Sequence, residues 1–248
     1  MRGILELHNR SGLRGGWEEE MRRYAATFVA AGVGIVVAGC GVSSHAIQTS
    51  TTTITSLIPR PVVLRELESF LLTPAQVNPL MGATGISLIR KHDEMSDDSA
   101  TMRPAECLAV DGSAQAQVYA NSGFTAVRDH ELNDGDSFTH YAEQAVVLFP
   151  TVKQAQIFFV GSALRWPACH HYVHTQSRTQ WDVGEISDDN DVLSATSTQE
   201  EAKAGGWACG RALAVKNNVV VDVNTCSSNP GSSAVDIANQ IVAKIVSR

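Results

Sequence analysis

The chain has 248 residues, a formal net charge of −7 at neutral pH and five cysteines. The negative balance argues against nucleic acid as a partner, and the lack of a basic run argues against electrostatic attachment to an anionic lipid surface. About 185 residues follow the N-terminal segments described below, which is enough for one domain with a substantial core.

Residues 1–20 are not expected to belong to the export signal that follows them. Glu18, Glu19 and Glu20 would place three acidic residues where a signal peptide carries positive charge. Translation is therefore expected to begin at Met21, and residues 1–20 are interpreted as an untranslated or wrongly assigned start.

Residues 21–39 have the features of a signal peptide. Arg22 and Arg23 precede an apolar run over residues 25–38, which is shorter than the roughly 20 residues that a membrane-spanning helix requires. Residues 37–40, with the sequence VAGC, then resemble the bacterial lipobox, whose cysteine receives a diacylglyceryl group and becomes the mature N-terminus. Cys40 is predicted to be this lipid anchor rather than a buried structural cysteine, because no neighbouring segment could enclose it.

Residues 40–63 are rich in serine and threonine and are predicted to form a flexible tether to one domain over residues 64–248. In that domain, capping-box signatures at Thr73 and Thr151 predict two helices, and the apolar spacing after Ser232 predicts a third. Strands are predicted over residues 86–89, 115–119, 125–131, 142–149, 171–176, 181–186, 192–198, 207–215 and 219–225. Hairpin-linked strands with helices at the beginning, middle and end predict an α+β fold, an antiparallel sheet covered by helices.

Four cysteines remain after Cys40, an even number that predicts two disulfides in an exported protein. They are Cys107, Cys169, Cys209 and Cys226. If Asn217 and Asn218 form a two-residue hairpin loop, Cys209 faces Cys226 in a non-hydrogen-bonded pair with Cα atoms about 4.5 Å apart. That distance lies within the disulfide range, so these two cysteines are predicted to be bonded, and the other two by elimination.

The same register assigns the hairpin side chains to two faces. One face is expected to belong to the core and carries Ala212, Ala214, Val219, Val221 and Val223. The other face carries the cystine together with Arg211, Asp222 and Asn224, and it is expected to be partly exposed. A cation and two acceptors there could serve a ligand-binding cleft, although an exposed cross-strand pair of Arg211 with Asn224 is the simpler interpretation.

Several longer stretches match a known family. They are LLTPAQVNPLMGATG (71–85), RPAEC (103–107), EQAVVLFPTVKQAQIFF (143–159), RWPAC (165–169) and WACGRALAVKNNVVVDVNTC (207–226). Together they resemble the extracellular sensor domain of PknH-type mycobacterial serine/threonine kinases, over nearly all of residues 66–246. The resemblance implies a central antiparallel sheet with helices on both faces, two disulfides and a cleft for an unidentified extracellular ligand. The lipobox and the lack of a kinase domain differ from the kinases, so signalling through a catalytic domain of its own is not expected.

Three further motifs suggest chemistry but have simpler interpretations. His170 and His174 would lie about 13 Å apart on a strand and could not share one zinc ion, so no metal site is predicted. Residues 135–138, with the sequence GDSF, resemble the opening of GDSL-type hydrolases, but they follow a polar segment and are expected to form a turn. Residues 188–191 offer oxygen ligands for calcium but lack the glycine and distal glutamate of an EF-hand loop, which favours a solvated turn.

No nucleophile, base and oxyanion donor can be combined from the sequence, so neither catalytic residues nor a cofactor is predicted. The leading hypothesis is a lipid-anchored extracytoplasmic ligand-binding or sensor-like lipoprotein of the mycobacterial cell envelope. Its expected partners are the membrane, through Cys40, and an unknown small molecule or envelope component. The alternatives are an envelope hydrolase, which a serine or aspartate beside a histidine would favour, and a scaffold for envelope proteins, which a flat apolar patch would favour.

Overall fold

The computed structural model describes residues 59–247. Residues 1–58 lie outside this range, and with them the proposed start, the signal peptide, Cys40 and most of the predicted tether. Within the described residues, no helix combines the length and the apolar character needed to cross a membrane.

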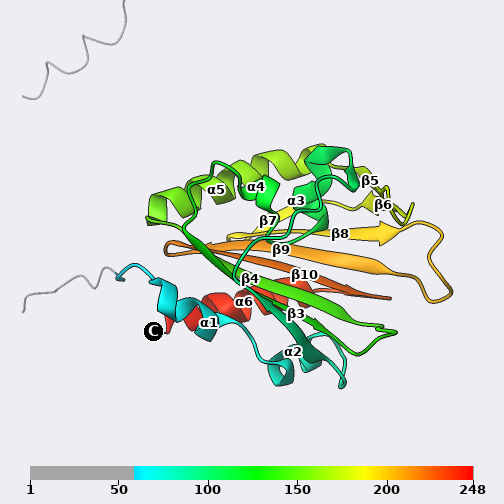
Figure 1. Ribbon diagram of the computed structural model, residues 1–248, viewed down its shortest axis with the longest axis horizontal. Helices are drawn as coiled ribbons and strands as arrows, with labels where there is room; N and C mark the ends of the chain where they lie inside the picture. The colour runs from blue at the N-terminus through cyan, green and yellow to red at the C-terminus, as the bar shows by residue number, and fades with distance from the viewer. Residues whose placement is uncertain (1–58, 248) are drawn as a thin grey trace, which may run out of the picture. The chain divides into compact units, whose positions relative to one another are not determined.

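The described residues form a ten-stranded sheet in which all neighbouring strands are antiparallel (Figure 1). Its order is β1-β3-β4-β10-β9-β8-β6-β5-β2, with β7 paired to β8. The strands are β1 (Ser87–His92), β2 (Met102–Arg103), β3 (Ala126–Asn133), β4 (Tyr141–Leu148), β5 (His171–His174), β6 (Gln180–Val183), β7 (Ser187–Asp189), β8 (Val192–Gln199), β9 (Ala208–Lys216) and β10 (Val219–Ser227).

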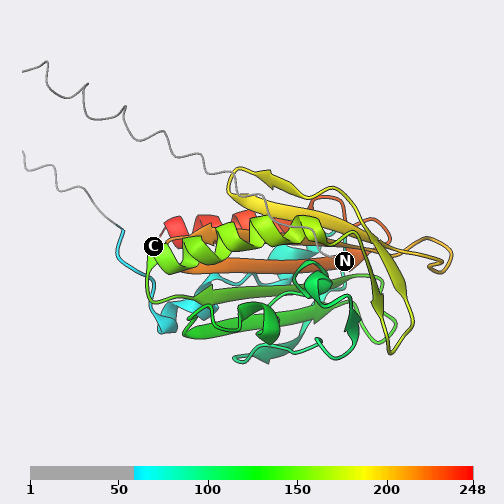
Figure 2. The ribbon, with the colours of Figure 1, turned by 90° about the horizontal axis from the view of Figure 1, so that it is seen from above.

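Helices cover both faces of this sheet, as the family resemblance implied. On one face lie α3 (Leu108–Asp111), α4 (Ala116–Tyr119) and α5 (Val152–Arg165), and on the other lie α1 (Leu67–Phe70), α2 (Pro74–Leu80) and α6 (Ser233–Val246) (Figure 1). Short 3₁₀ turns are η1 (Leu64–Glu66), η2 (Ala105–Cys107) and η3 (Trp166–Ala168). Seen from above, α5 follows β9 and β10, while the part of the face formed by β3 and β4 lies beside this helix (Figure 2).

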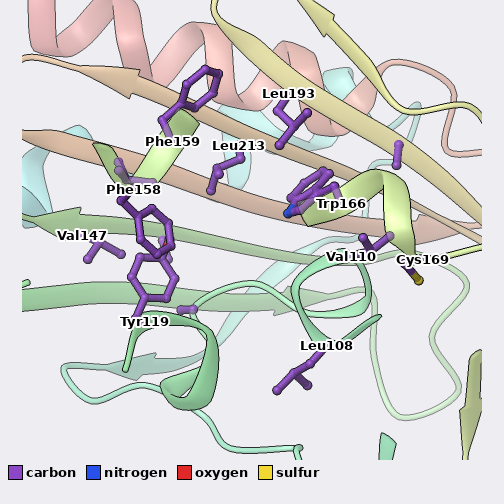
Figure 3. Packing of buried hydrophobic residues seen from close by; sticks show 14 of the residues in the cluster. Leu108, Val110, Tyr119, Val147, Phe158, Phe159, Trp166, Cys169, Leu193 and Leu213 are labelled. Atoms are coloured by element: carbon purple, nitrogen blue, oxygen red, sulfur yellow. The ribbon is translucent and has the colours of Figure 1, made fainter. Parts of the chain in front are cut away.

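The core beneath α5 is aromatic. The helix begins where Thr151 Oγ1 accepts a hydrogen bond from the backbone N–H of Gln154, at 3.2 Å, as the capping-box signature predicted. Its inner side buries Phe158 and Phe159, and the ring of Phe158 stacks on Tyr119 of α4 at 4.2 Å between centroids (Figure 3). The stretch 115–119, predicted as a strand, instead contributes the short helix α4, which brings Tyr119 onto Phe158.

The core beneath α6 is aliphatic. Apolar residues at helical spacing, including Ile237, Ile241 and Ile245, are all at most 2% exposed and pack against the hairpin face that was predicted to be buried. Val221 and Val223 of that face are completely buried. The hairpin thus lies between two cores, since its opposite face contributes Leu213 and Val220 to the aromatic core.

The predicted hairpin register is confirmed. Asn217 takes the positive φ of 55° that tight hairpins demand, and Cys209 lies directly opposite Cys226. The two are disulfide-bonded, with Cα atoms 4.1 Å apart. The second predicted bond, between Cys107 and Cys169, is also present and joins η2 to the end of η3 across 62 residues of sequence.

The folded domain begins before residue 64, which corrects the expected end of the tether. Val62 is 3% exposed, and its backbone N–H and C=O both hydrogen-bond to the side-chain amide of Asn218, at 2.7 and 3.1 Å. The same amide donates to the backbone oxygen of Phe149. Asn218 of the hairpin loop therefore fixes the incoming chain to the sheet, a contact that composition alone could not indicate.

Candidate functional site

Four acidic side chains lie close together on the sheet face that α3, α4 and α5 cover. Strand pairing places Glu131 of β3 opposite Glu143 of β4, and it places Asp129 of β3 and Asp222 of β10 on either side of Ala145. Because alternate residues of a strand share a face, all four carboxylates point to the same side. We call Asp129, Glu131, Glu143 and Asp222 the carboxylate band.

At one end of the band, Asp222 forms a buried ion pair with Arg211 of β9. The Nη1–Oδ1 distance is 2.8 Å, and both residues are 2% exposed. The other carboxylate oxygen of Asp222 accepts hydrogen bonds from the hydroxyl of Tyr119, at 2.8 Å, and from the backbone N–H of Ala114, at 3.0 Å. These two donors attach the α3–α4 segment to the sheet.

The guanidinium of Arg211 has further hydrogen-bond acceptors, one in the sheet and two in the segment that covers it. It donates to the backbone oxygen of Val223 at 2.6 Å, and to those of Ala109 and Gly112 at 3.0 Å each. Its central carbon lies 5.3 Å from the centroid of the Trp166 ring, within cation–π range. Such a planar, multiply bonded cation suits a buried site better than a lysine would.

These contacts correct the expectation for Arg211, Asp222 and Asn224. The structure does bring the three residues together on the cystine's face, and Asn224 does oppose Arg211 across the hairpin. The face is covered rather than partly exposed, since Asn224 is only 8% exposed, and Arg211 pairs with Asp222 instead. The covering segment lies about 100 residues away in sequence, so hairpin geometry could not reveal it.

At the centre of the band, the carboxyl groups of Asp129 and Glu143 lie within hydrogen-bonding reach of each other. Asp129 is 3% exposed, and no N–H or O–H group within residues 59–247 donates to its Oδ1. Burial, followed by the neighbouring Glu143 carboxylate, raises the pKa of Asp129 to about 10. Burial also raises the pKa of Glu143, against the opposing effect of its hydrogen bond with Asp129. Asp129 is buried and Glu143 is half-buried, and the raised pKa of Asp129 favours a proton on this carboxyl at neutral pH.

At its other edge the band is more open. Glu131 is only partly buried and lies 3.5 Å from the guanidinium of Arg90, on the edge strand β1. His92 Nε2 lies 4.0 Å from the same carboxylate. The band thus places four carboxyl groups beside two arginines, so acidic groups outnumber the arginines at the edge that is open to solvent.

The band leads to an aromatic pocket through Tyr141, two residues before Glu143 on the same face of β4. The Tyr141 ring lies 5.9 Å from that of Phe138, which lies 6.0 Å from that of Trp207. Phe138 and Trp207 line a pocket of about 330 Å³ together with Gln199 and Lys203. Phe138 is 43% exposed, so part of its ring is available at the surface of this pocket.

Sequence reasoning missed Asp129, Glu143 and Tyr119. Asp129 lies between Arg128 and His130, and Glu143 precedes Gln144, so both acids stand among polar residues that are typical of an exposed stretch of strand. The available signal was that Glu131 and Glu143 would face each other on adjacent strands, an arrangement that is unfavourable without a proton or a cation.

The other sequence motifs have structural roles. His174 does not meet His170 but hydrogen-bonds to Asp111 at 2.9 Å, and this bond raises its pKa against the effect of burial. Residues 135–138 form the turn between β3 and β4, and residues 190–191 have positive φ in the turn between β7 and β8.

An aspartate does lie beside a histidine in the β3–β4 turn, the feature that would favour a hydrolase. His140 Nδ1 lies 2.9 Å from Asp134 Oδ2. The same aspartate also accepts the hydroxyl of Thr139, at 2.7 Å, and the backbone N–H groups of both Thr139 and His140. The Thr139 hydroxyl also lies 3.1 Å from His140 Nδ1, so all three side chains belong to one local network, and the two backbone bonds to Asp134 are those of an Asx-type turn.

Comparisons with known proteins agree with this architecture. The family model described as "PknH-like extracellular domain" matches residues 63–244. The serine/threonine-protein kinases PknH of Mycobacterium bovis and Mycobacterium tuberculosis are each 34% identical over 195 residues. These matches cover 77% of this chain but only 32% and 30% of the two kinases, so the chain spans about a third of their length.

A solved structure shares the fold as well. The crystal structure of the extracellular domain of PknH from Mycobacterium tuberculosis superposes with a TM-score of 0.72 at 32% identity, covering 76% of this chain and 99% of that one. The family model, the sequence identity and the shared fold together show that the chain belongs to the family of PknH-like extracellular domains.

Proposed function

We propose that the protein is a lipid-anchored, extracytoplasmic ligand-binding module of the mycobacterial cell envelope. Its family consists of extracellular domains, so the folded part lies outside the cytoplasm. The lipobox ending at Cys40 supports attachment through a lipid.

Cys40→Ala tests the anchor. The wild-type protein is expected to partition into the detergent phase with the mass of a lipidated N-terminus, whereas the variant keeps its signal peptide or is released without lipid. A lipid-sized mass on the variant would contradict the assignment of Cys40.

The ligand site that we propose is the open end of the carboxylate band with the aromatic pocket beside it. The observation that carries this proposal is the grouping of Asp129, Glu131 and Glu143 on one face of β3 and β4, where burial raises the pKa of Asp129 and favours a proton on that carboxyl. A bound cationic group could replace that proton and neutralise the band, while an apolar part of the same ligand packs on Phe138 and Trp207. The expected ligand is thus an amphipathic molecule with an amine or another cationic group.

Thermal shift measurements with matched panels of cationic, neutral and anionic amphiphiles test this class. Cationic compounds should raise the melting temperature of the wild type, and Glu143→Gln should abolish that shift, because the amide cannot accept the charge. Asp136→Asn, an exposed site in the β3–β4 turn, is the control and should respond like the wild type. An equal response of Glu143→Gln, or stabilisation by anionic compounds alone, would refute the proposed site.

A scaffold is the second candidate, because of the outer side of α5. Ile157, Val160 and Leu164 lie at i, i+3 and i+7 and are 60%, 53% and 78% exposed. An apolar stripe of this kind on a folded domain favours a protein contact. If it binds an envelope protein, Leu164→Glu should eliminate crosslinks that the wild type forms in cells, and Lys153→Glu, at the exposed start of the same helix, should not.

A further inference from the structure

A second cluster of ionisable side chains lies toward the other edge of the sheet from the carboxylate band. His171 of β5 directly opposes Asp182 of β6, and Glu200 follows the end of β8, the next strand. His171 Nδ1 lies 3.3 Å from Asp182 Oδ1 and 3.4 Å from Glu200 Oε1, and the three atoms all lie within 4.8 Å of one another. We infer that His171, Asp182 and Glu200 bind a divalent transition metal ion, with zinc as the best match.

The spacing of these atoms fits a tetrahedral ion. Zinc bonds to nitrogen and oxygen of about 2.0–2.1 Å separate neighbouring ligand atoms by roughly 3.3 Å at tetrahedral angles. The two distances from the imidazole, 3.3 and 3.4 Å, match this separation, although the shorter one is also that of a hydrogen bond. Only the two carboxylates need to approach each other, which half-exposed side chains can do by rotation.

The charges also favour a cation. Within the described residues, neither Asp182 nor Glu200 has a lysine or arginine nitrogen within 4.0 Å, so His171 is the partner shared by both. With a neutral imidazole, the site carries two negative charges side by side. An imidazole with two carboxylates suits zinc and its neighbours, whereas calcium and magnesium prefer oxygen ligands alone.

The backbone beneath the cluster holds the ligands in place. Tyr172 and Trp181, on the opposite side of the same two strands, are buried and stack at 5.9 Å with nearly parallel rings. The backbone N–H of Glu200 donates to the oxygen of Gln180 at 2.8 Å. Cys169, two residues before His171, is fixed by its disulfide. Three protein ligands on paired strands would leave one position of the ion open to water or to a partner's side chain.

Isothermal titration of the purified, untagged protein with zinc chloride tests the site. One ion per chain is expected, and His171→Ala should weaken binding at least tenfold, with Asp182→Asn and Glu200→Gln each reducing it. His170→Ala removes the neighbouring exposed histidine and is the matched control, so it should bind as the wild type does.

Cobalt supplies a second readout, because a bound ion gives visible absorption bands that His171→Ala should eliminate and His170→Ala should retain. Unchanged zinc affinity in His171→Ala, equal losses in both histidine variants, or tighter binding of calcium than of zinc would each overturn the assignment. Thermal unfolding without metal should be alike in all four variants, because the ligand side chains are 38–69% exposed and do not support the core.

Discussion

Replacing Asp129 by asparagine should alter how the stability of the domain depends on pH. The asparagine amide can donate to Glu143 as the protonated carboxyl does, so the contact survives while the proton does not. In the wild type, burial raises the pKa of Asp129 in the folded state to about 10, whereas an unfolded aspartate titrates near 3.9.

The direction in which stability changes with pH follows from proton binding. Between these two pKa values the native state holds a proton that the unfolded state has lost, so the free energy of unfolding falls as pH rises. The contribution of the pair is fully present below about pH 4 and is lost progressively up to about pH 10. One proton corresponds to at most about 1.4 kcal/mol per pH unit, or about 2.7 kcal/mol between pH 6 and pH 8.

Urea unfolding of the wild type, Asp129→Asn and the exposed control Asp136→Asn at pH 6, 7 and 8 measures this dependence. Relative to the wild type, Asp129→Asn should gain stability with rising pH, and the control should follow the wild type throughout. Titratable groups elsewhere contribute equally to the wild type and the variant, so their effects cancel in the difference between the two. A difference between Asp129→Asn and the wild type that stays constant from pH 6 to pH 8 would refute the proton on Asp129.

Three further outcomes follow from the packing. Arg211→Met should destabilise the domain by about 3 to 5 kcal/mol in chemical denaturation, because it leaves Asp222 buried without its cation. Adding Asp222→Leu should restore much of that stability, and a double variant no more stable than Arg211→Met would contradict the importance of the ion pair. Replacing Cys107 and Cys169 by serines should cost about 1 kcal/mol more stability than replacing Cys209 and Cys226, since the bonds span 62 and 17 residues. Urea midpoints at equal m-value measure the difference, and the reverse order would show that chain entropy does not dominate. Val221→Ala, at a completely buried site between the sheet and α6, should lower the free energy of unfolding by about 1 to 3 kcal/mol, and a loss below 0.5 kcal/mol would be inconsistent with that packing.

The β9–β10 hairpin shows what local sequence can determine. Turn chemistry at Asn217 fixes the register, the register aligns Cys209 with Cys226, and alternation assigns every side chain of the two strands to a face. The helices α5 and α6 could also be predicted, because the cap of α5 and the apolar spacing of α6 are properties of short segments.

The chemistry of the candidate site could not be predicted in this way. Arg211 lies on a strand whose alternation gives its face but not what covers that face. The covering segment is held by contacts distant in sequence, among them Tyr119 with Phe158 and with Asp222. The raised pKa of Asp129 likewise depends on burial in the folded domain. The cluster of His171, Asp182 and Glu200 combines β5, β6 and the residue after β8, which are separated in sequence, so the histidine-rich stretch alone does not indicate it.

Native mass spectrometry of the protein extracted from its own cell envelope tests the central claim most directly, because a binding module should retain a natural ligand through gentle purification. The wild type is expected to carry a dissociable adduct in addition to its lipid, which Glu143→Gln and Trp207→Ala lose and Asp136→Asn keeps. An adduct of equal occupancy in all four proteins, or none in the wild type under conditions that preserve its fold, would contradict ligand binding at the carboxylate band.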